Sequence, residues 1–434
     1  MLTFKPMEAR MKKWAILLIP VVFITFVSCD IFGGIGAPYL AGPTDGEEVG
    51  QTPALSWSAV EGATGYKVEI DDADDFSSPD VTAEVTDTFY SVGVADALDP
   101  GTYYWHVASK DENNEYGKFS DAKSFVVSED VGPFVGTLDL SDTYPNKCAV
   151  SGNTVYMAAK GAGLVAIDVS NPSNPAELDR FDNEGVIWDV YVDGSTAYAT
   201  DNSDAVYILD VSDPANIKKL DEINPGLDCR GVYVSGGYLY ITASTGSDGV
   251  FQIYDLADTD SCIFEATFTG NAATEVMVTD KKAYISGGKT WGKLWIYDVS
   301  DPANATSLGM FESTRGGGAL NVYVVGTTAY LSNWDAGLEI LDCSDPANIT
   351  SPGYYNPVDA VYEAIVVGDI AYVANSWGGL KIVDLSDPMN PEELVSLDGD
   401  VYAHISLLGL DMDDNYVYLP DNGNKAFHVV SADY

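Results

Sequence analysis

The segment AVYILDVSDP at residues 205–214 is the clearest indication of the fold, because close copies of it recur along the chain. Four such copies are GLVAIDVSNP at 163–172, KLWIYDVSDP at 293–302, GLEILDCSDP at 337–346 and GLKIVDLSDP at 379–388. The aspartate that the repeats share falls every 42 to 45 residues, at Asp168, Asp210, Asp255, Asp298, Asp342 and Asp384. A period of this length fits a repeated unit of four short strands, as in the blades of a β-propeller.

Two further strands precede each aspartate segment and are joined by a tight glycine turn, as in VYVDGSTAYAT at 190–200. Seven such pairs can be counted. A fourth strand follows each aspartate segment, but the final unit, whose third strand is the degenerate copy KAFHVVSADY at 425–434, lacks its own. The spare strand VGTLDL at 135–140 precedes the first pair, so we expect it to complete the last unit and close the ring. The sequence therefore predicts an all-β, seven-bladed β-propeller over residues 133–434.

These repeats resemble the LVIVD repeat family of bacterial exported proteins over residues 135–434. The resemblance implies a propeller but no particular chemistry, because one fold supports many functions. The recurring aspartate and the Ser-Asp-Pro turn after it are interpreted as scaffold, with aspartate oxygens accepting backbone N–H groups and proline presetting φ. Cys148 and Cys343 stand where sister repeats carry Val or Leu, so we expect them in the core.

A smaller domain of the fibronectin type III kind is predicted over residues 38–128. The stretch LSWSAVEGATGYKVEI places Trp57 on one strand and Tyr66 on the next. The stretch LDPGTYYWHV at 98–107 resembles the turn into the penultimate strand of fibronectin type III domains. The fold predicted for the whole chain is therefore a fibronectin type III-like sandwich followed by the propeller, and the sandwich would serve as a spacer.

A secretory leader precedes both domains. Lys12 and Lys13 come before an apolar run at 14–26, which is short for a membrane span and has the flanks of a signal peptide. The run ends in Phe-Val-Ser-Cys at 26–29, which resembles the bacterial lipobox that precedes an acylated cysteine. An uncleaved anchor helix is the alternative, and it would also tether the globular part outside the cytoplasm.

The lipobox resemblance implies the processing and the location of the protein. We predict a lipoprotein signal peptide over residues 1–28, lipidation of Cys29 and a linker over 29–37. Acyl chains on the cysteine would hold the protein on a membrane of the bacterial cell envelope. The expected location is therefore the periplasm or the cell surface.

The net charge of −45 limits the partners, since Asp and Glu number 66 against 21 Lys and Arg. Such a field repels phosphate backbones, so nucleic acid is not expected as a partner, whereas cations, basic proteins and neutral sugars remain open. Adaptation to a salty habitat is the alternative explanation of the acidic surface. The acidic run at 71–75 could hold calcium, but it lacks the glycine and terminal glutamate of an EF-hand loop and is interpreted as solvated.

One face of the propeller carries the candidate site, because the loop between the second and third strands of a blade lies beside the start of the innermost strand. The repeats lose their regularity on this face. Lys147 starts the first inner strand, and the candidate ligand-binding residues are Trp188, Asp189, Arg230, Glu275, Asn321, Asn333, Trp334, Tyr362, Glu363, Asn375 and Trp377. Indoles beside polar groups suit a sugar. Trp291, Trp334 and Trp377 recur at equivalent positions, so wedging between neighbouring blades is the alternative.

The sequence favours binding over catalysis. The three histidines are scattered, and no metal-spaced cluster, nucleophile elbow or phosphate loop occurs, so we expect no cofactor. We expect a membrane-anchored extracytoplasmic protein whose propeller face recognises a glycan or an envelope or surface protein. One alternative is a hydrolase that uses channel carboxylates such as Asp189, Glu275 and Glu363. A structural scaffold of an envelope complex is another.

Overall fold

The computed structural model describes residues 35–50, 53–86, 88–92, 98–128, 134–172, 174–182, 185–202, 204–397 and 405–432. The predicted signal peptide, the lipidation site Cys29 and the first part of the predicted linker lie outside these ranges and stay predictions. Within the ranges, no helix is both long and apolar enough to cross a membrane. The described chain is all-β, as predicted, and divides into two compact units, each of which is treated by itself.

The N-terminal strands form two sheets. The smaller sheet has the order β1 (Leu40–Gly42), β3 (Ala54–Trp57) and β6 (Phe89–Ser91). The larger sheet has the order β2 (Glu47–Val49), β9 (Lys123–Val127), β7 (Gly101–Lys110), β4 (Gly65–Asp71) and β5 (Val81–Val85), and β8 (Tyr116–Phe119) pairs with β7. Trp57 and Tyr66 lie on successive strands, as predicted, and their ring centroids are 5.5 Å apart in an edge-to-face contact.

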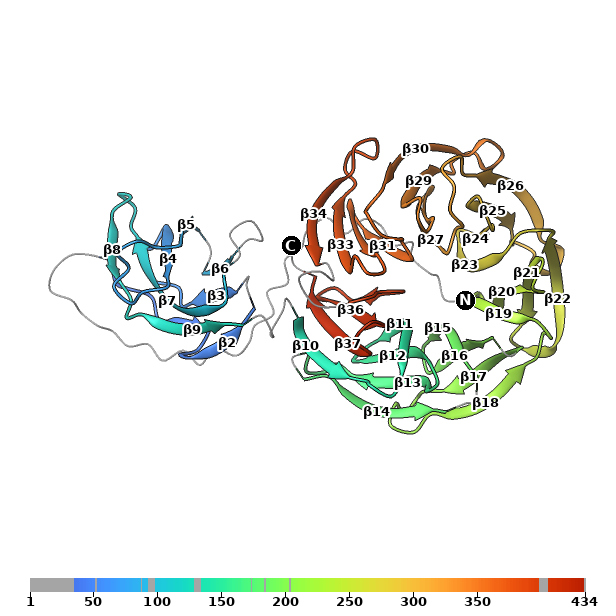
Figure 1. Ribbon diagram of the computed structural model, residues 1–434, viewed down its shortest axis with the longest axis horizontal. Helices are drawn as coiled ribbons and strands as arrows, with labels where there is room; N and C mark the ends of the chain where they lie inside the picture. The colour runs from blue at the N-terminus through green and yellow to red at the C-terminus, as the bar shows by residue number, and fades with distance from the viewer. Residues whose placement is uncertain are drawn as a thin grey trace. The chain divides into compact units, whose positions relative to one another are not determined.

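Among the described residues, seven four-stranded antiparallel sheets follow, and Figure 1 shows them around a common centre, as in a β-propeller. The first three, from the inner to the outer strand, are β11 (Tyr144–Ser151), β12 (Thr154–Lys160), β13 (Gly163–Asp168) and β14 (Ala176–Phe181); β15 (Ile187–Asp193), β16 (Thr196–Asp201), β17 (Ala205–Asp210) and β18 (Lys218–Ile223); and β19 (Asp228–Ser235), β20 (Tyr238–Ser244), β21 (Gly249–Asp255) and β22 (Asp258–Phe268).

The next three sheets repeat this order of strands. They are β23 (Ala273–Thr279), β24 (Lys282–Gly287), β25 (Lys293–Asp298) and β26 (Thr306–Glu312); β27 (Asn321–Val325), β28 (Thr328–Ser332), β29 (Leu338–Asp342) and β30 (Thr350–Tyr355); and β31 (Glu363–Val367), β32 (Ile370–Ala374), β33 (Leu380–Asp384) and β34 (Glu392–Leu397). The last sheet has the order β10 (Phe134–Asp139), β37 (Ala426–Ser431), β36 (Tyr416–Asp421) and β35 (Asp411–Met412), so it takes one strand from the start of the repeats.

The recurring aspartate ends the third strand of its sheet and fixes the turn that follows. A carboxylate oxygen of Asp168, Asp210 or Asp342 accepts the backbone N–H of the residue two positions on, at 2.8, 3.0 and 2.9 Å. The prolines of two Ser-Asp-Pro turns begin the short 3-10 helices η3 (Pro302–Asn304) and η4 (Pro346–Asn348), where their fixed φ suits the first position. The interpretation of these residues as scaffold is confirmed.

The hydrophobic core lies between neighbouring sheets. Leu164 of the first sheet, for example, packs in one cluster with Ile187 and Leu209 of the second. Burying a side chain of this size stabilises the fold by about 1.5–3 kcal/mol. Cys148 and Cys343 are buried in such clusters, which confirms their predicted place in the core. Each blade is thus held mainly by the apolar face of the next.

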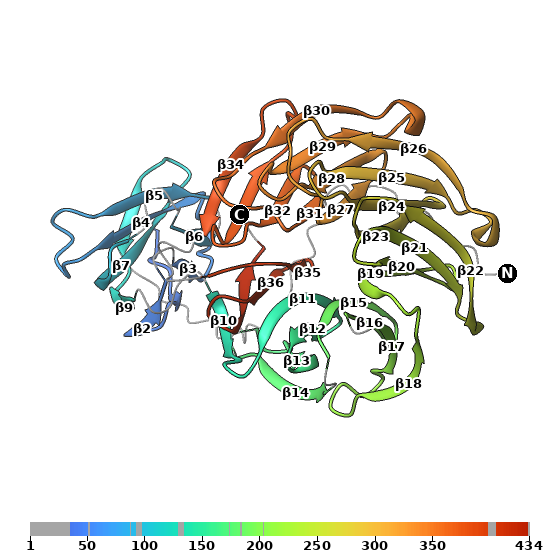
Figure 2. The same ribbon diagram turned by 45° about the vertical axis from the view of Figure 1, so that its right-hand side comes forward.

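Strand β10 occupies the place of an outer strand in the last sheet and pairs with β37 (Figure 2). Gly136 on this strand pairs with Val429, just as Gly309 pairs with Ile296 in the fourth sheet. A Cβ atom at Gly136 would overlap the carbonyl oxygen of Pro172, and one at Gly309 would overlap the carbonyl oxygen of the corresponding proline in the next sheet. The spare strand of the sequence analysis, β10, therefore packs against a proline of another sheet in the same way as the regular outer strand β26.

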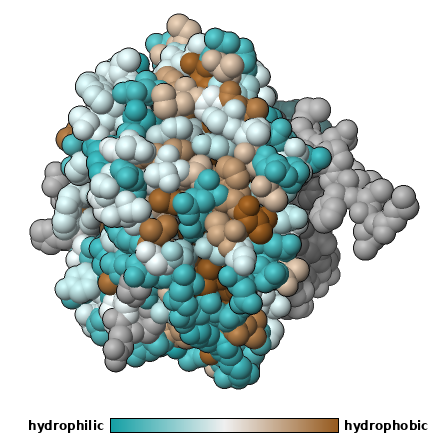
Figure 3. Space-filling view, turned by 90° about the vertical axis from the view of Figure 1, so that its right-hand side faces the viewer, coloured by the Kyte–Doolittle hydropathy of each residue, from teal (hydrophilic) through white to brown (hydrophobic). Residues whose placement is uncertain are grey.

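The side of the molecule shown in Figure 3 is covered mostly by hydrophilic and neutral residues, with hydrophobic residues scattered among them. Single exposed apolar residues of this kind are common on soluble proteins. The irregular face of the propeller therefore remains the main place to look for a ligand.

Candidate functional site

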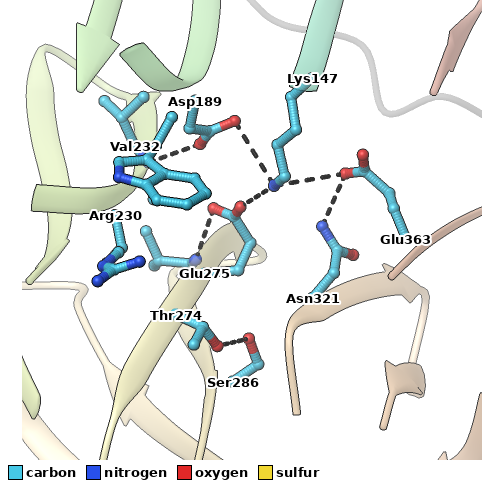
Figure 4. A network of polar contacts seen from close by, with 12 residues as sticks. Lys147, Asp189, Arg230, Val232, Thr274, Glu275, Ser286, Asn321 and Glu363 are labelled. Carbon is cyan, nitrogen blue, oxygen red and sulfur yellow. Dashed lines mark hydrogen bonds and ion pairs between the residues drawn. The ribbon is translucent and has the colours of Figure 1, made fainter. Parts of the chain in front are cut away.

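Four charged side chains converge from the inner strands of four different sheets (Figure 4). The ammonium of Lys147 on β11 lies 3.5 Å from a carboxylate oxygen of Asp189 on β15 and 3.7 Å from one of Glu363 on β31. It also forms an ion pair with Glu275 on β23. All four side chains are mostly buried. We call these four residues the central cluster.

The carboxylates of the central cluster also bind the backbone and side chains of neighbouring sheets. Asp189 accepts the N–H of Val232 at 2.9 Å, across the boundary between the second and third sheets. Glu363 accepts the side-chain amide of Asn321 at 2.7 Å and the N–H of Leu410 at 3.2 Å. These bonds join consecutive inner strands, so the cluster holds the blades to one another and leaves few carboxylate oxygens free.

Burial and mutual repulsion shift the titration of the cluster. Burial acts to lower the pKa of Lys147, but the charges of the three carboxylates outweigh it and raise that pKa well above its usual value. Burial, followed by the charge of Asp189, raises the pKa of Glu275 to about 8, although Lys147 opposes the shift. Burial also raises the pKa of Glu363 to about 7. The glutamates therefore exchange protons near neutral pH while the lysine stays charged.

Three tryptophans lie exposed on loops between second and third strands. Trp291 follows β24, Trp334 follows β28 and Trp377 follows β32, with exposed fractions of 44, 44 and 56%. A side chain wedged between blades would be buried, so these values do not fit the wedge interpretation. The loops thus present three flat apolar rings to solvent on successive blades.

The positions of Trp334 and Trp377 are not equivalent, contrary to the prediction from the repeats. The carbonyl of Trp334 accepts the N–H of Val361 in the next blade at 3.1 Å, whereas in the following loop Ser376 makes the corresponding bridge to Leu407. Trp334 and Ser376 share a left-handed backbone, with φ of 46° and 44°. Trp377 comes one residue later, so the two indoles leave their loops from different places.

The two asparagines of the predicted set lie beneath these loops and are buried. The N–H of Asn333 donates to the carbonyl of Gly337, and that of Asn375 donates to the carbonyl of Gly379, both at 2.8 Å. With its amide nitrogen assigned to the side that faces acceptors, Asn375 also donates to the carbonyl of Asp359 at 2.6 Å. The backbone of both asparagines therefore supports the loops, whereas the buried side-chain oxygen and nitrogen of Asn333 have no hydrogen-bond partner among the described residues.

A second charged group surrounds Trp188 on β15. The Nζ of Lys160, at the end of β12, lies 4.4 Å from the centroid of the indole ring, and the Cζ of Arg230 on β19 lies 4.9 Å from it. The guanidinium of Arg230 also donates to Asp228 at 2.6 Å. Cations held over an indole face are attracted by its quadrupole. This arrangement brings together residues from three blades.

The structure thus separates the eleven predicted residues into three groups. Asp189, Glu275, Asn321 and Glu363 meet at the central cluster. Trp334 and Trp377 lie on the loops with Asn333, Asn375 and Tyr362, whose pKa is raised by burial and by Asp335. Trp188 and Arg230 form the third group with Lys160, which the sequence prediction missed. The sequence does place Lys160 at the end of the second strand of its blade, where the loops of the irregular face begin, and this position could have identified it.

A possible cation site lies in the N-terminal unit. One carboxylate oxygen from each of Asp71, Asp72 and Asp80 lies within 4.8 Å of the others. The oxygens of Asp71 accept the N–H groups of Ala73 and Ser78, and an Asp80 oxygen accepts that of Asp72. The charge of Asp80 is the main cause that raises the pKa of Asp72. The turn thus uses several of its carboxylate oxygens to accept its own backbone N–H groups.

The fold and this face define a β-propeller protein with regular turns on one side and irregular loops on the other. A family model described as the LVIVD repeat matches residues 145–183, 184–220, 227–247, 270–312, 316–356 and 363–398, which is half of the sequence. The chain belongs to the LVIVD repeat family. No functionally curated protein matches it.

Solved structures show the same fold at low sequence identity. The computationally designed Ika8 protein has a TM-score of 0.52 and 10% identity, covering 69% of this chain and 100% of its own. A chain of the mitotic checkpoint complex has a TM-score of 0.55 and 12% identity, covering 68% and 90%. Raptor from Chaetomium thermophilum has a TM-score of 0.56 and 14% identity, covering 69% of this chain but 28% of its own. Likeness at these identities concerns the fold alone.

Proposed function

We propose that this protein is an extracytoplasmic binding protein whose propeller face recognises a glycan or a protein partner through Trp334 and Trp377. The observation that carries the proposal is their exposure, 44 and 56%, on loops fixed by bonds to the next blade. An indole offers a large rigid surface at little conformational cost, which suits either the apolar face of a sugar ring or an apolar side chain of a partner.

The backbone of Trp334 supports this proposal. Its φ of 46° lies in the left-handed region, which costs a non-glycine residue of order 1 kcal/mol or more. Glycine would remove that cost at the same place. A bulky side chain that is held there and remains exposed is therefore better explained by contact with a ligand than by stability.

A binding screen on the full-length chain in detergent tests this function. Glycan arrays and envelope-protein fractions are screened beside the double variant Trp334→Ala/Trp377→Ala. The matched control is Met389→Ala, which removes an exposed apolar side chain from a Ser-Asp-Pro turn on the opposite face. We expect hits of the parent to persist in the control and to weaken at least about tenfold in the double variant. Hits that persist undiminished in the double variant would refute the proposal.

A hydrolase remains the second candidate, because three acidic side chains converge and two of them have raised pKa values. The bonds of these carboxylates to Lys147 and to backbone N–H groups favour a structural role instead. The two functions separate experimentally. Glu275→Gln would abolish the turnover of a hydrolase, whereas a binding protein would retain its affinity.

We also infer the setting in which this binding takes place. The seven sheets would form one closed ring of seven blades, the N-terminal sheets a fibronectin type III-like spacer, and a lipidated Cys29 the anchor on an envelope membrane. A lipid anchor and a spacer would present the propeller face to ligands at a distance from the membrane. Nucleic acid is not proposed as a partner, given the net charge of −45.

A further inference from the structure

The group around Trp188 places two cations beside one indole on the face of an otherwise acidic protein. Lys160, Trp188 and Arg230 come from the first, second and third sheets, and both cations lie within 5 Å of the ring centroid. Figure 4 shows the Arg230 side chain apart from the ion pairs of Lys147. We call these three residues the cationic group.

The two cations differ in their partners. Arg230 is paired with Asp228, whose carboxylate lies 2.6 Å away. Within the described ranges, Lys160 has no carboxylate at ion-pair distance. Burial, followed by the charge of Arg230, lowers the pKa of Lys160, so repulsion between the two cations is not cancelled at the lysine. A negative charge placed between them would relieve this repulsion.

The indole itself offers a further group for recognition. The Nε1 of Trp188 is buried and has no hydrogen-bond acceptor among the described residues. Buried donors are nearly always paired, so an unpaired one marks a place where water or a ligand supplies the partner. A cation pair, an aromatic ring and a free donor are the features that recognise an anionic group attached to a flat apolar body.

We propose that the cationic group binds the carboxylate or sulfate of an acidic glycan. This inference rests on the proposed function, because it assigns the chemistry of the ligand on the same face. The guanidinium of Arg230 suits a planar carboxylate or a sulfate, to which it donates two parallel hydrogen bonds. The ring of Trp188 favours a saccharide over a peptide terminus, because sugars stack on aromatic faces, and Trp291 is exposed on the blade next to that of Arg230.

The net charge of −45 does not oppose an anion at this place. Charges separated by more than the Debye length, about 8 Å at physiological ionic strength, are largely screened. The charges close to the cationic group therefore matter more than the net charge of the chain. Among the described residues, Asp228 is the one carboxylate in contact with this group. This inference departs from the sequence-based expectation of a neutral or basic ligand.

Trace acylation of the full-length chain with acetic anhydride tests the proposal. Peptide mapping by mass spectrometry gives the acylation rate of Lys160, with Lys218 on β18 and Lys281 on the turn between β23 and β24 as internal references away from this face. The probes are sodium sulfate, a panel of acidic oligosaccharides bearing uronate or sulfate groups, the carboxyl-reduced forms of the uronates, and peptides with free or amidated C-termini. Sodium chloride matches the ionic strength in every sample.

Sulfate and at least one acidic oligosaccharide should slow the acylation of Lys160. The carboxyl-reduced or neutral counterpart of that oligosaccharide and sodium chloride should have no effect. Arg230→Gln should weaken this protection about tenfold, as expected for the loss of charge-assisted hydrogen bonds. Asp228→Asn should strengthen it, because it frees the guanidinium. A variant is interpreted only if its melting temperature matches the parent.

Two results would overturn the proposal. Equal protection by sodium chloride and sulfate would mean that no anion site exists, and protection by sulfate or free C-terminal peptides but by no acidic oligosaccharide would remove the glycan assignment. The proposed function stands or fails separately. If glycan hits of the full-length chain disappear in the double tryptophan variant but are unchanged in Arg230→Gln, the face binds glycans and the cationic group takes no part.

Discussion

The ammonium of Lys147 lies 3.7 Å from the carboxylate of Glu363, although the two residues belong to the first and sixth sheets of the propeller. The same ammonium pairs with Asp189 of the second sheet and Glu275 of the fourth. One lysine is therefore the shared cation of three buried acidic groups, two of which are partly protonated near neutral pH. Its removal would leave the remaining negative charge of the cluster without a cation.

Lys147→Met should lower the free energy of unfolding by about 3–5 kcal/mol, the usual cost of breaking a buried ion pair from one side. Chemical denaturation at neutral pH measures this value. Lys218→Met is the matched control, because Lys218 is exposed on the outer strand β18. Equal midpoints for the two variants would mean that the central cluster does not stabilise the ring.

The melting temperature should fall as the pH rises from about 6 to about 8.5. Glutamate titrates near pH 4.3 in an unfolded chain, whereas burial raises the pKa of Glu275 to about 8 and that of Glu363 to about 7. The folded state therefore binds more protons in this window, and the stability that these protons provide is lost as the pH passes through the folded pKa values.

Glu275→Gln removes one of these titrating groups and should flatten the pH profile, as followed by calorimetry. Glu312→Gln, at a partly exposed side chain, should keep the slope of the parent. A parent protein whose melting temperature rises over this window would contradict the assigned shifts.

Gly136→Ala tests the closure of the ring. A Cβ atom at this position would overlap the carbonyl oxygen of Pro172, as one at Gly309 would overlap that of Pro346. Both substitutions should therefore destabilise the protein by about 1–3 kcal/mol, the range for overpacking. If Gly309→Ala lowers the denaturation midpoint and Gly136→Ala does not, β10 is not the outer strand of the last sheet in solution.

The architecture of the propeller could be predicted from sequence because its determinants are local and repeated. The aspartate that ends the third strand accepts a backbone N–H two residues on in six of the seven sheets, so it recurs along the sequence. The strand at 135–140 was recognisable because VGTLDL is an extra copy of the fourth strands, such as AELDRFD and KKLDEIN, and stands before the first strand pair.

The details of the site could not be predicted, because they depend on contacts between blades. The offset between Trp334 and Trp377 follows from which residue bridges to the next blade, Trp334 in one loop and Ser376 in the other. Lys160 joins Trp188 and Arg230 only through the packing of three sheets. A repeat pattern gives the place of a residue along its strand but not the neighbour that its side chain meets.

The predicted anchor lies outside the described residues and has its own test. The parent protein should carry acyl chains on Cys29 as its N-terminal residue, and Cys29→Ala should lose the partitioning into detergent. Mass spectrometry of the purified protein and detergent phase separation measure the two properties. An unacylated parent, with a variant that partitions in the same way, would replace the lipoprotein by an uncleaved anchor helix.

The most direct test of the central claim is oxidative footprinting of the full-length protein with and without the ligand that the screen retains. If the face with the exposed indoles binds the ligand, the oxidation rates of Trp334 and Trp377 should fall on binding. The rate of Met389, which is exposed on a Ser-Asp-Pro turn of the opposite face, should not change. Protection of Met389 with unchanged oxidation of both tryptophans would place the ligand elsewhere and contradict the account.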